Sequence, residues 1–217
     1  MQVSQTQGCL TIGGSMKAVY VFTNVGMPGI VKIGKTTQSV ESRMRDLDTT
    51  GIPYPFECFY AAEVADENAT EKKVHEVFAD KRIRPKREFF EVDAVQARAA
   101  VQLACIKDVT PRSYVFDDPD DLLALEREIK KRPRFKMTMA DVSPGEKLSF
   151  VYNEEIVAVV IDDEKIEFEG GAMSLSASAL IAAKQCGYDW KAIAGPEYWL
   201  YKGESLAALR MAKEKEG

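Results

Sequence analysis

The sequence predicts an α+β protein built from two small domains, and three observations lead to this expectation. Strand-like and helix-like patterns are interspersed in both halves of the 217 residues. A polar stretch bracketed by prolines separates the halves. The formal charge also divides there, because residues 16–112 carry 15 Lys and Arg against 14 Asp and Glu, while residues 113–217 carry 14 against 20. We expect an extension at 1–15, a first domain at 16–112, a linker at 113–136 and a second domain at 137–217.

The first domain is expected to open with a β-hairpin. Residues 18–23 (AVYVFT) and 30–35 (IVKIGK) have the alternation of strands, and NVGMPG supplies the turn between them. Ser39 suits the N-cap of a helix with Val40 and Met44 on its apolar stripe. The further elements expected are a strand at 56–64, a helix from Asp66 to about Lys81, a basic loop, a short strand at 88–92 and a helix at 93–106.

The second half is expected to hold a smaller α+β unit. The linker contains one short helix, predicted at 120–131. Three strands are then expected within 141–168, followed by an apolar helix between a serine N-cap and a glycine C-cap in SLSASALIAAKQCG. EYWLYKG reads as a strand and ESLAALRMAKEKE as a charged terminal helix.

Cysteine usage and hydropathy exclude several classes of protein. The four cysteines are far apart and form no CxxC, which argues against a zinc site and a disulfide framework and favours a reducing cytoplasm. No apolar run approaches the roughly 20 residues needed to span a bilayer, so no membrane association is expected. Residues 1–15 lack the charged and apolar parts of a secretory signal, and we expect them to be a disordered extension.

The hairpin carries two polar side chains where a plain core would have apolar ones. Alternation places Tyr20 and Lys32 on the face opposite the valines and isoleucine of the two strands. A nearby ammonium would lower the pKa of the Tyr20 phenol from about 10 and make it useful as a base. The alternative is a solvated pair on the outer face of a hairpin.

Arg43 lies on the apolar stripe of the first expected helix. A guanidinium that points inward costs desolvation free energy unless it meets an anion, so Arg43 is a candidate for binding one. Alternatively, its stem packs against Met44 while its head reaches water. Arg45, two residues later, points the other way and is an ordinary solvated residue.

Two further candidates follow along the chain. His75 is the single histidine of the sequence and lies at the edge of a helix, one turn after Glu71, which is placed to orient it; a structural histidine is the alternative. Glu88 starts a short strand directly after five Lys and Arg within residues 81–87. With waters and a phosphate it suits a hard divalent cation, although a charge that protects an edge strand is the alternative.

Together these residues form a known pattern. Residues 16–92 resemble the GIY-YIG nuclease superfamily, especially its phage- and restriction-associated branch. The first motif appears as Ala18-Val19-Tyr20 and the second as Lys32-Ile33-Gly34; the arginine, histidine and glutamate positions fall on Arg43, His75 in EKKVHEVF and Glu88 in REFF. Alanine replaces the glycine of the first motif, lysine replaces the tyrosine of the second, and no asparagine is assigned after Glu88.

The resemblance implies a small antiparallel sheet flanked by helices and hydrolysis of DNA phosphodiesters with one Mg2+ or Mn2+. Tyr20, helped by Lys32, would be the general base, and Arg43 would stabilise charge on the phosphoryl oxygens. Glu88 would hold the metal, and His75 would move protons or orient Tyr20. The DNA backbone would be gripped by cations that supply affinity without sequence choice: Lys35, Lys81, Arg82, Arg84, Lys86 and Arg87.

Residues 143–210 resemble, more loosely, the RAMA domain of restriction enzymes and adenine methylases, on the stretches GEKLSFVYNEEIVAVVIDDEKIEF, SLSASALIAAK and YWLYKGESL. This resemblance implies recognition of DNA, including modified DNA, through the second domain. Two functions therefore compete: a DNA endonuclease of phage defence, restriction or a mobile element, and a binding module that keeps the fold without the activity. The sequence does not specify an oligomeric state.

Overall fold

The computed structural model describes residues 16–113, 115, 119–131 and 133–216. Its first part is an antiparallel five-stranded sheet in the order β4-β2-β1-β3-β5. The strands are β1 (Ala18–Thr23), β2 (Ile30–Thr36), β3 (Glu57–Glu63), β4 (Phe89–Glu91) and β5 (Lys107–Asp108). The expected extension at 1–15 lies outside the described residues.

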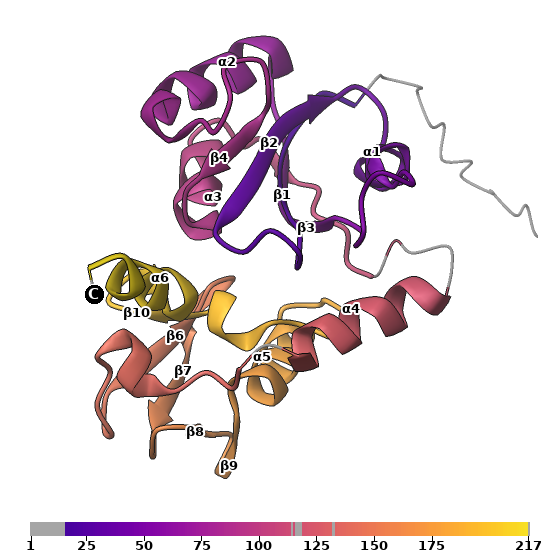
Figure 1. Cartoon of the computed structure of the whole chain (residues 1–217). Coiled ribbons are helices and arrows are strands. Elements are labelled where there is room, and N and C mark those ends of the chain that lie inside the picture. The colour runs from indigo at the N-terminus through magenta and orange to yellow at the C-terminus, as the bar shows by residue number, and fades with distance from the viewer. Residues whose placement is uncertain (1–15, 114, 116–118, 132, 217) are drawn as a thin grey trace, which may run out of the picture.

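Helices cover both faces of this sheet. They are α1 (Val40–Leu47), α2 (Glu67–Val77) and α3 (Ala94–Gln102). Each starts at an oxygen-bearing N-cap: Ser39 accepts from Ser42 N at 3.1 Å, and Asp66 accepts from two backbone N–H groups at 2.9 Å. The α2 and α3 helices pack on one face, and α1 lies against the other (Figure 1).

Two helices end earlier than the sequence pattern predicts. The expected helix to Lys81 stops at Val77 and gives way to a 3₁₀ turn, Ala79–Lys81, because the chain must turn back to place Arg82 beside Phe90. The expected helix at 93–106 stops at Gln102. The Ile106 N–H instead donates to Glu63 O at 2.8 Å, which starts β5 on the free edge of β3.

The second part contains a six-stranded antiparallel sheet in the order β11-β10-β6-β7-β8-β9. The strands are β6 (Lys147–Phe150), β7 (Asn153–Val160), β8 (Lys165–Phe168), β9 (Gly171–Ser174), β10 (Trp199–Tyr201) and β11 (Glu204–Ser205). The helical elements are α4 (Pro119–Lys131), α5 (Leu175–Gln185), α6 (Leu206–Glu216) and the 3₁₀ turns Met137–Ala140 and Gly195–Glu197. The two sheets among helices confirm the predicted α+β class, while the domain boundaries stay a prediction.

Apolar packing and hydrogen bonds join the two sheets. Buried side chains on the α3 side of the first sheet and inside the second form one continuous cluster. The Tyr152 hydroxyl donates to Phe59 O, and the Arg98 guanidinium donates to Val151 O. Figure 1 shows the second sheet and its helices directly beneath the first. None of the helices in the described part of the chain is long and apolar enough to cross a membrane.

Candidate functional site around Tyr20

The face of the first sheet that α1 covers carries Tyr20 in β1. Tyr20 lies opposite Gly34 in β2, and its ring stacks on Phe22 at 3.9 Å between centroids. A Cβ atom at Gly34 would approach the Tyr20 hydroxyl oxygen to 2.4 Å. The glycine of the second motif therefore leaves the space in which the phenol lies across β2. Tyr20 has no exposed surface, so the solvated pair considered from the sequence is not what the structure contains.

Arg43 is the direct partner of Tyr20. The helix α1 turns this side chain toward the sheet, and its Nε donates to the Tyr20 hydroxyl oxygen at 3.2 Å. Burial raises the pKa of the Tyr20 phenol, and the hydrogen bond and charge of Arg43 only partly offset that effect. The expected lowering of this pKa by Lys32 is thus not found, because the phenol is buried and Lys32 has another partner.

Lys32 forms an ion pair with Glu88. Antiparallel pairing brings the β4 end of the chain beside β2, where the Ile33 N–H donates to Glu88 O at 3.1 Å. The Lys32 ammonium bonds Oε2 of Glu88 and lies 5.3 Å from the centroid of the Phe89 ring. Partial burial acts to raise the pKa of Glu88, but Lys32, with smaller effects of His75 and Arg43, outweighs it and holds the pKa below its ordinary value.

His75 lies at the edge of the same strand. Its Nε2 is 2.9 Å from the carbonyl oxygen of Ile33, so Nε2 carries the hydrogen and donates. The imidazole ring also packs against Phe90 at 4.9 Å. Glu71, the residue expected to orient His75, instead accepts from Lys35 at 2.5 Å. His75 therefore has a structural contact with β2 through Ile33 O. Lys35, which was expected to contact DNA, forms an ion pair with Glu71.

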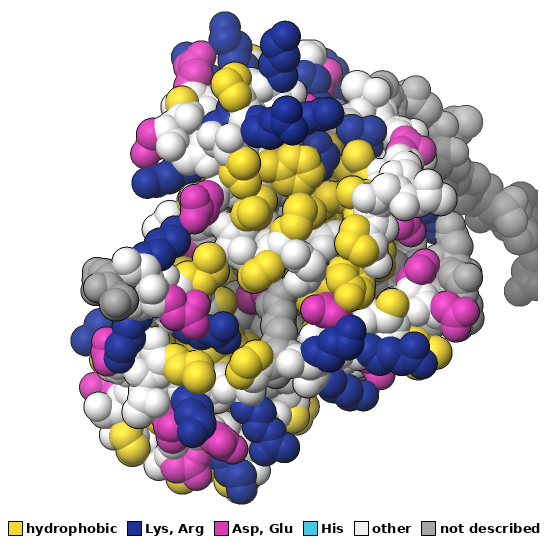
Figure 2. All heavy atoms as spheres, viewed as in Figure 1, with side chains coloured by type: hydrophobic (Ala, Val, Ile, Leu, Met, Phe, Trp, Pro, Cys, Tyr) yellow, Lys and Arg dark blue, Asp and Glu magenta, His cyan; other side chains and the backbone are white. Residues whose placement is uncertain are grey.

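The basic loop before β4 contains two kinds of cation. Arg82 is structural, because its guanidinium donates to Pro85 O at 3.0 Å and stacks on Phe90 at 4.9 Å. Lys81 lies 3.4 Å from an oxygen of its neighbour Asp80. The other three are exposed and form no ion pair within the described residues: Arg84, Lys86 and Arg87. Figure 2 shows Lys and Arg side chains gathered over the first sheet, above an apolar strip.

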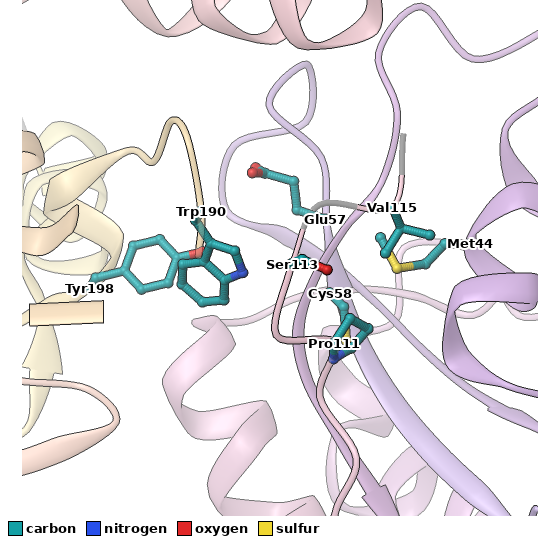
Figure 3. Close-up of a pocket in the computed structure, with 8 residues that line it drawn as sticks. All are labelled: Met44, Glu57, Cys58, Pro111, Ser113, Val115, Trp190 and Tyr198. Atoms are coloured by element: carbon teal, nitrogen blue, oxygen red, sulfur yellow. The ribbon is translucent and has the colours of Figure 1, made fainter. Parts of the chain in front are cut away.

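A small cavity lies elsewhere, at the junction of the two sheets. Figure 3 shows it between Met44, Glu57 and Cys58 of the first part and Trp190 and Tyr198 of the second. Its volume of about 30 Å³ has room for one or two water molecules. It is too small for a nucleotide and does not include Tyr20, so it is not the substrate site.

The structure brings together Tyr20 with Arg43, and Lys32 with Glu88, on the side of the first sheet that α1 covers. His75 comes from α2 on the other side and contacts Ile33 O and Phe90 instead. Sequence reasoning missed two contacts of the site. Glu71 was assigned to His75, although its contact is with Lys35. Phe89, over whose ring the Lys32 ammonium lies, was treated only as a strand residue. Its position opposite Lys32 requires the β2–β4 register, which no local pattern reveals.

Comparison with known proteins locates a family in this part of the chain. No curated protein and no solved structure matches the sequence. The expected RAMA resemblance at 143–210 stays a prediction. Residues 17–105, fewer than half of the chain, match the model of the T5orf172 domain. The segment that builds the Tyr20 site is therefore similar to a GIY-YIG-like domain family.

Proposed function

We propose that the protein is a metal-dependent endonuclease that hydrolyses DNA phosphodiester bonds. The observation that carries the proposal is the contact of Arg43 with Tyr20 beside the Lys32–Glu88 ion pair, within a segment similar to a GIY-YIG-like family. One phenol, one guanidinium, one ammonium and one carboxylate on one face of a sheet supply the groups that phosphoryl transfer to water requires.

Arg43 has two tasks in this proposal. Its Nε fixes the Tyr20 hydroxyl, and its Nη groups are the donors for the phosphoryl oxygens, where charge increases in the transition state. Donors aimed at such oxygens typically contribute about 10²–10³ in rate. The fork of the guanidinium makes both contacts possible from one side chain.

Tyr20 acts on the attacking water. Its oxygen accepts from Arg43, so its deprotonated form would have a guanidinium as counter-ion. Burial keeps the pKa of the phenol above its ordinary value, so the basic form is scarce at neutral pH. The reaction should therefore become faster in alkaline solution.

Glu88 would hold the divalent cation. Within the described residues no group of three His, Cys, Asp or Glu side chains gathers around it, and 40% of its side chain is exposed. This donor set fits Mg2+ or Mn2+, since Mg2+ commonly keeps several waters and uses one or two carboxylates together with substrate phosphate. A bound cation would supply Lewis-acid stabilisation of the phosphoryl and leaving oxygens.

A cleavage assay tests the proposal. Plain and modified DNA would be incubated with Mg2+, with Mn2+ and with EDTA. We expect nicking or cutting with either metal and none with EDTA. Glu88→Ala should abolish cleavage, whereas Glu76→Ala, which removes an exposed carboxylate of α2 paired only at the surface, should leave it unchanged. Full activity in EDTA would contradict the proposal.

The second candidate is a binding module without nuclease activity. The raised pKa of Tyr20 and the engagement of Glu88 by Lys32 favour it. In that case the protein binds DNA, including modified DNA through its second domain, and no metal yields cleavage at any pH between 6 and 9.5.

In the nuclease proposal the protein acts in the cytoplasm, as part of phage defence, restriction or a mobile element.

A further inference from the structure

Lys32 and Glu88 form an ion pair whose two members differ strongly in burial. Only 8% of the Lys32 side chain is exposed, against 40% of Glu88. The ammonium bonds Oε2 of Glu88, the carboxylate proposed above to hold a divalent cation. The nearly buried ammonium of Lys32 is therefore bonded to the same carboxylate, that of Glu88, that is proposed to bind the metal ion.

A metal ion at Glu88 must compete with this ammonium. Two cations on one carboxylate repel each other, and a buried ammonium that loses its anion has a large desolvation cost. Among the described residues, the ion-pair partner of Lys32 is Glu88. The carboxylate of Glu71 is already engaged by Lys35. Without another anion, the metal affinity of Glu88 is lowered by Lys32.

A DNA phosphate supplies the missing anion. Lys32 lies on the same face of β2 as Gly34, across which the Tyr20 phenol lies, so a phosphodiester at Tyr20 and Arg43 is on the side of the sheet that Lys32 faces. Transfer of the ammonium from Glu88 to that phosphate frees the carboxylate. We infer that Lys32 exchanges Glu88 for a DNA phosphate and so makes the binding of divalent cation and of DNA mutually dependent.

This inference rests on the proposed function, and its consequence is reciprocal. If DNA raises the Mn2+ affinity by some factor, Mn2+ must raise the DNA affinity by the same factor. The protein would hold metal weakly until it is on DNA.

Mn2+ binding measured by electron paramagnetic resonance tests the exchange without relying on catalysis. The full chain is titrated with Mn2+ alone and with a short phosphorothioate duplex, which keeps the backbone charge. For the wild type we expect DNA to tighten Mn2+ binding roughly tenfold. For Lys32→Met we expect tighter Mn2+ binding without DNA, by about the same factor, and a smaller further effect of DNA.

Two controls isolate the role of Lys32. Lys73→Met removes the same charge and an ion pair with Glu76, but on the exposed face of α2, so Mn2+ binding should stay as in the wild type. Lys32→Arg keeps a cation at the carboxylate and should keep Mn2+ binding weak without DNA. Thermal unfolding of each variant establishes that it is folded, and Glu88→Ala should remove the Mn2+ site.

The exchange is overturned if Lys32→Met binds Mn2+ no more tightly than the wild type, or if Lys73→Met tightens binding equally. Either result leaves the nuclease proposal standing when the wild type still cleaves DNA. Conversely, a wild type that couples Mn2+ to DNA but never cleaves would overturn the nuclease proposal and support the exchange. The two failures are therefore distinguishable.

Discussion

The Nε of Arg43 donates a 3.2 Å hydrogen bond to the Tyr20 hydroxyl oxygen, and this bond links α1 to the centre of the first sheet. It opposes the effect of burial on the phenol, whose pKa nevertheless lies above its ordinary value. The group that tunes Tyr20 is thus Arg43, whereas Lys32 serves Glu88.

The pH dependence of cleavage should follow this arrangement. If Tyr20 is the base, the rate should increase about tenfold per pH unit between pH 7 and 9.5 without a plateau, because the phenol pKa is raised. In Arg43→Met the phenolate loses its counter-ion, so the pKa rises further and the rate near neutrality falls. Arg45→Met, an exposed change on the same helix, should keep the wild-type profile. A rate that levels off well below pH 9.5 would contradict Tyr20 as the base.

Gly34→Ala should damage both stability and activity. The new Cβ would lie 2.4 Å from the Tyr20 hydroxyl oxygen, and the phenol cannot retreat because it is stacked on Phe22. Overpacking of this kind typically lowers the free energy of unfolding by about 1–3 kcal/mol, measurable by urea titration.

Two variants qualify this prediction. Gly51→Ala meets only Thr49 Oγ1, at 3.9 Å, and should change stability by less than about 0.5 kcal/mol. Adding Tyr20→Phe to Gly34→Ala removes the closest clashing atom, so the double variant should be more stable than the sum of the two single effects predicts. Wild-type stability in Gly34→Ala would contradict the described packing.

The loop cations should control DNA affinity through salt. Replacing Arg84, Lys86 and Arg87 by glutamine should weaken binding for all sequences alike. It should also flatten the dependence of log affinity on log salt by about 0.9 for each phosphate of B-DNA that the loop no longer neutralises. Lys184→Gln, an exposed change on the second part, is the matched control. An unchanged salt slope in the triple variant would show that DNA binds elsewhere.

Limited trypsin digestion should cut around residues 113–135, within the expected linker at 113–136. The two fragments should remain associated under native conditions, because Tyr152 and Arg98 bond across the junction of the sheets. Tyr152→Phe removes one of these bonds and should make the fragments separate more easily on size exclusion. A single uncut core over 100–150 would show that the boundary is misplaced.

Local patterns predict much of this fold. Ser39 and Asp66 are N-caps whose chemistry needs no tertiary context, and the NVGMPG turn is likewise local. The helix ends near Val77 and Gln102 were missed because long-range pairing decides them. The α2 helix ends before the Arg82–Phe90 bridge, and α3 ends before the β3–β5 pairing. In both segments the local sequence pattern still favours a helix.

The site divides in the same way. Alternation correctly placed Tyr20 and Lys32 on one face of the hairpin, yet their partners come from elsewhere. Glu88 lies 56 residues after Lys32 in the chain and reaches it only because β4 pairs with β2. The Tyr20 face of the sheet is buried by α1 and by Phe56 from the segment before β3. The alternation of residues within one strand cannot show which face other elements will bury.

One carboxylate contributes to the starts of two helices far apart in the chain. Asp93 accepts from Val95 N at the start of α3, and it also accepts from the N–H and hydroxyl of Ser205, whose oxygen caps α6. The Ser205 hydroxyl that caps α6 thus donates to an acceptor 112 residues earlier in the chain. The start of α6 can take this form only when the second sheet lies against α3, so the order of α6 reports the docking of the two parts.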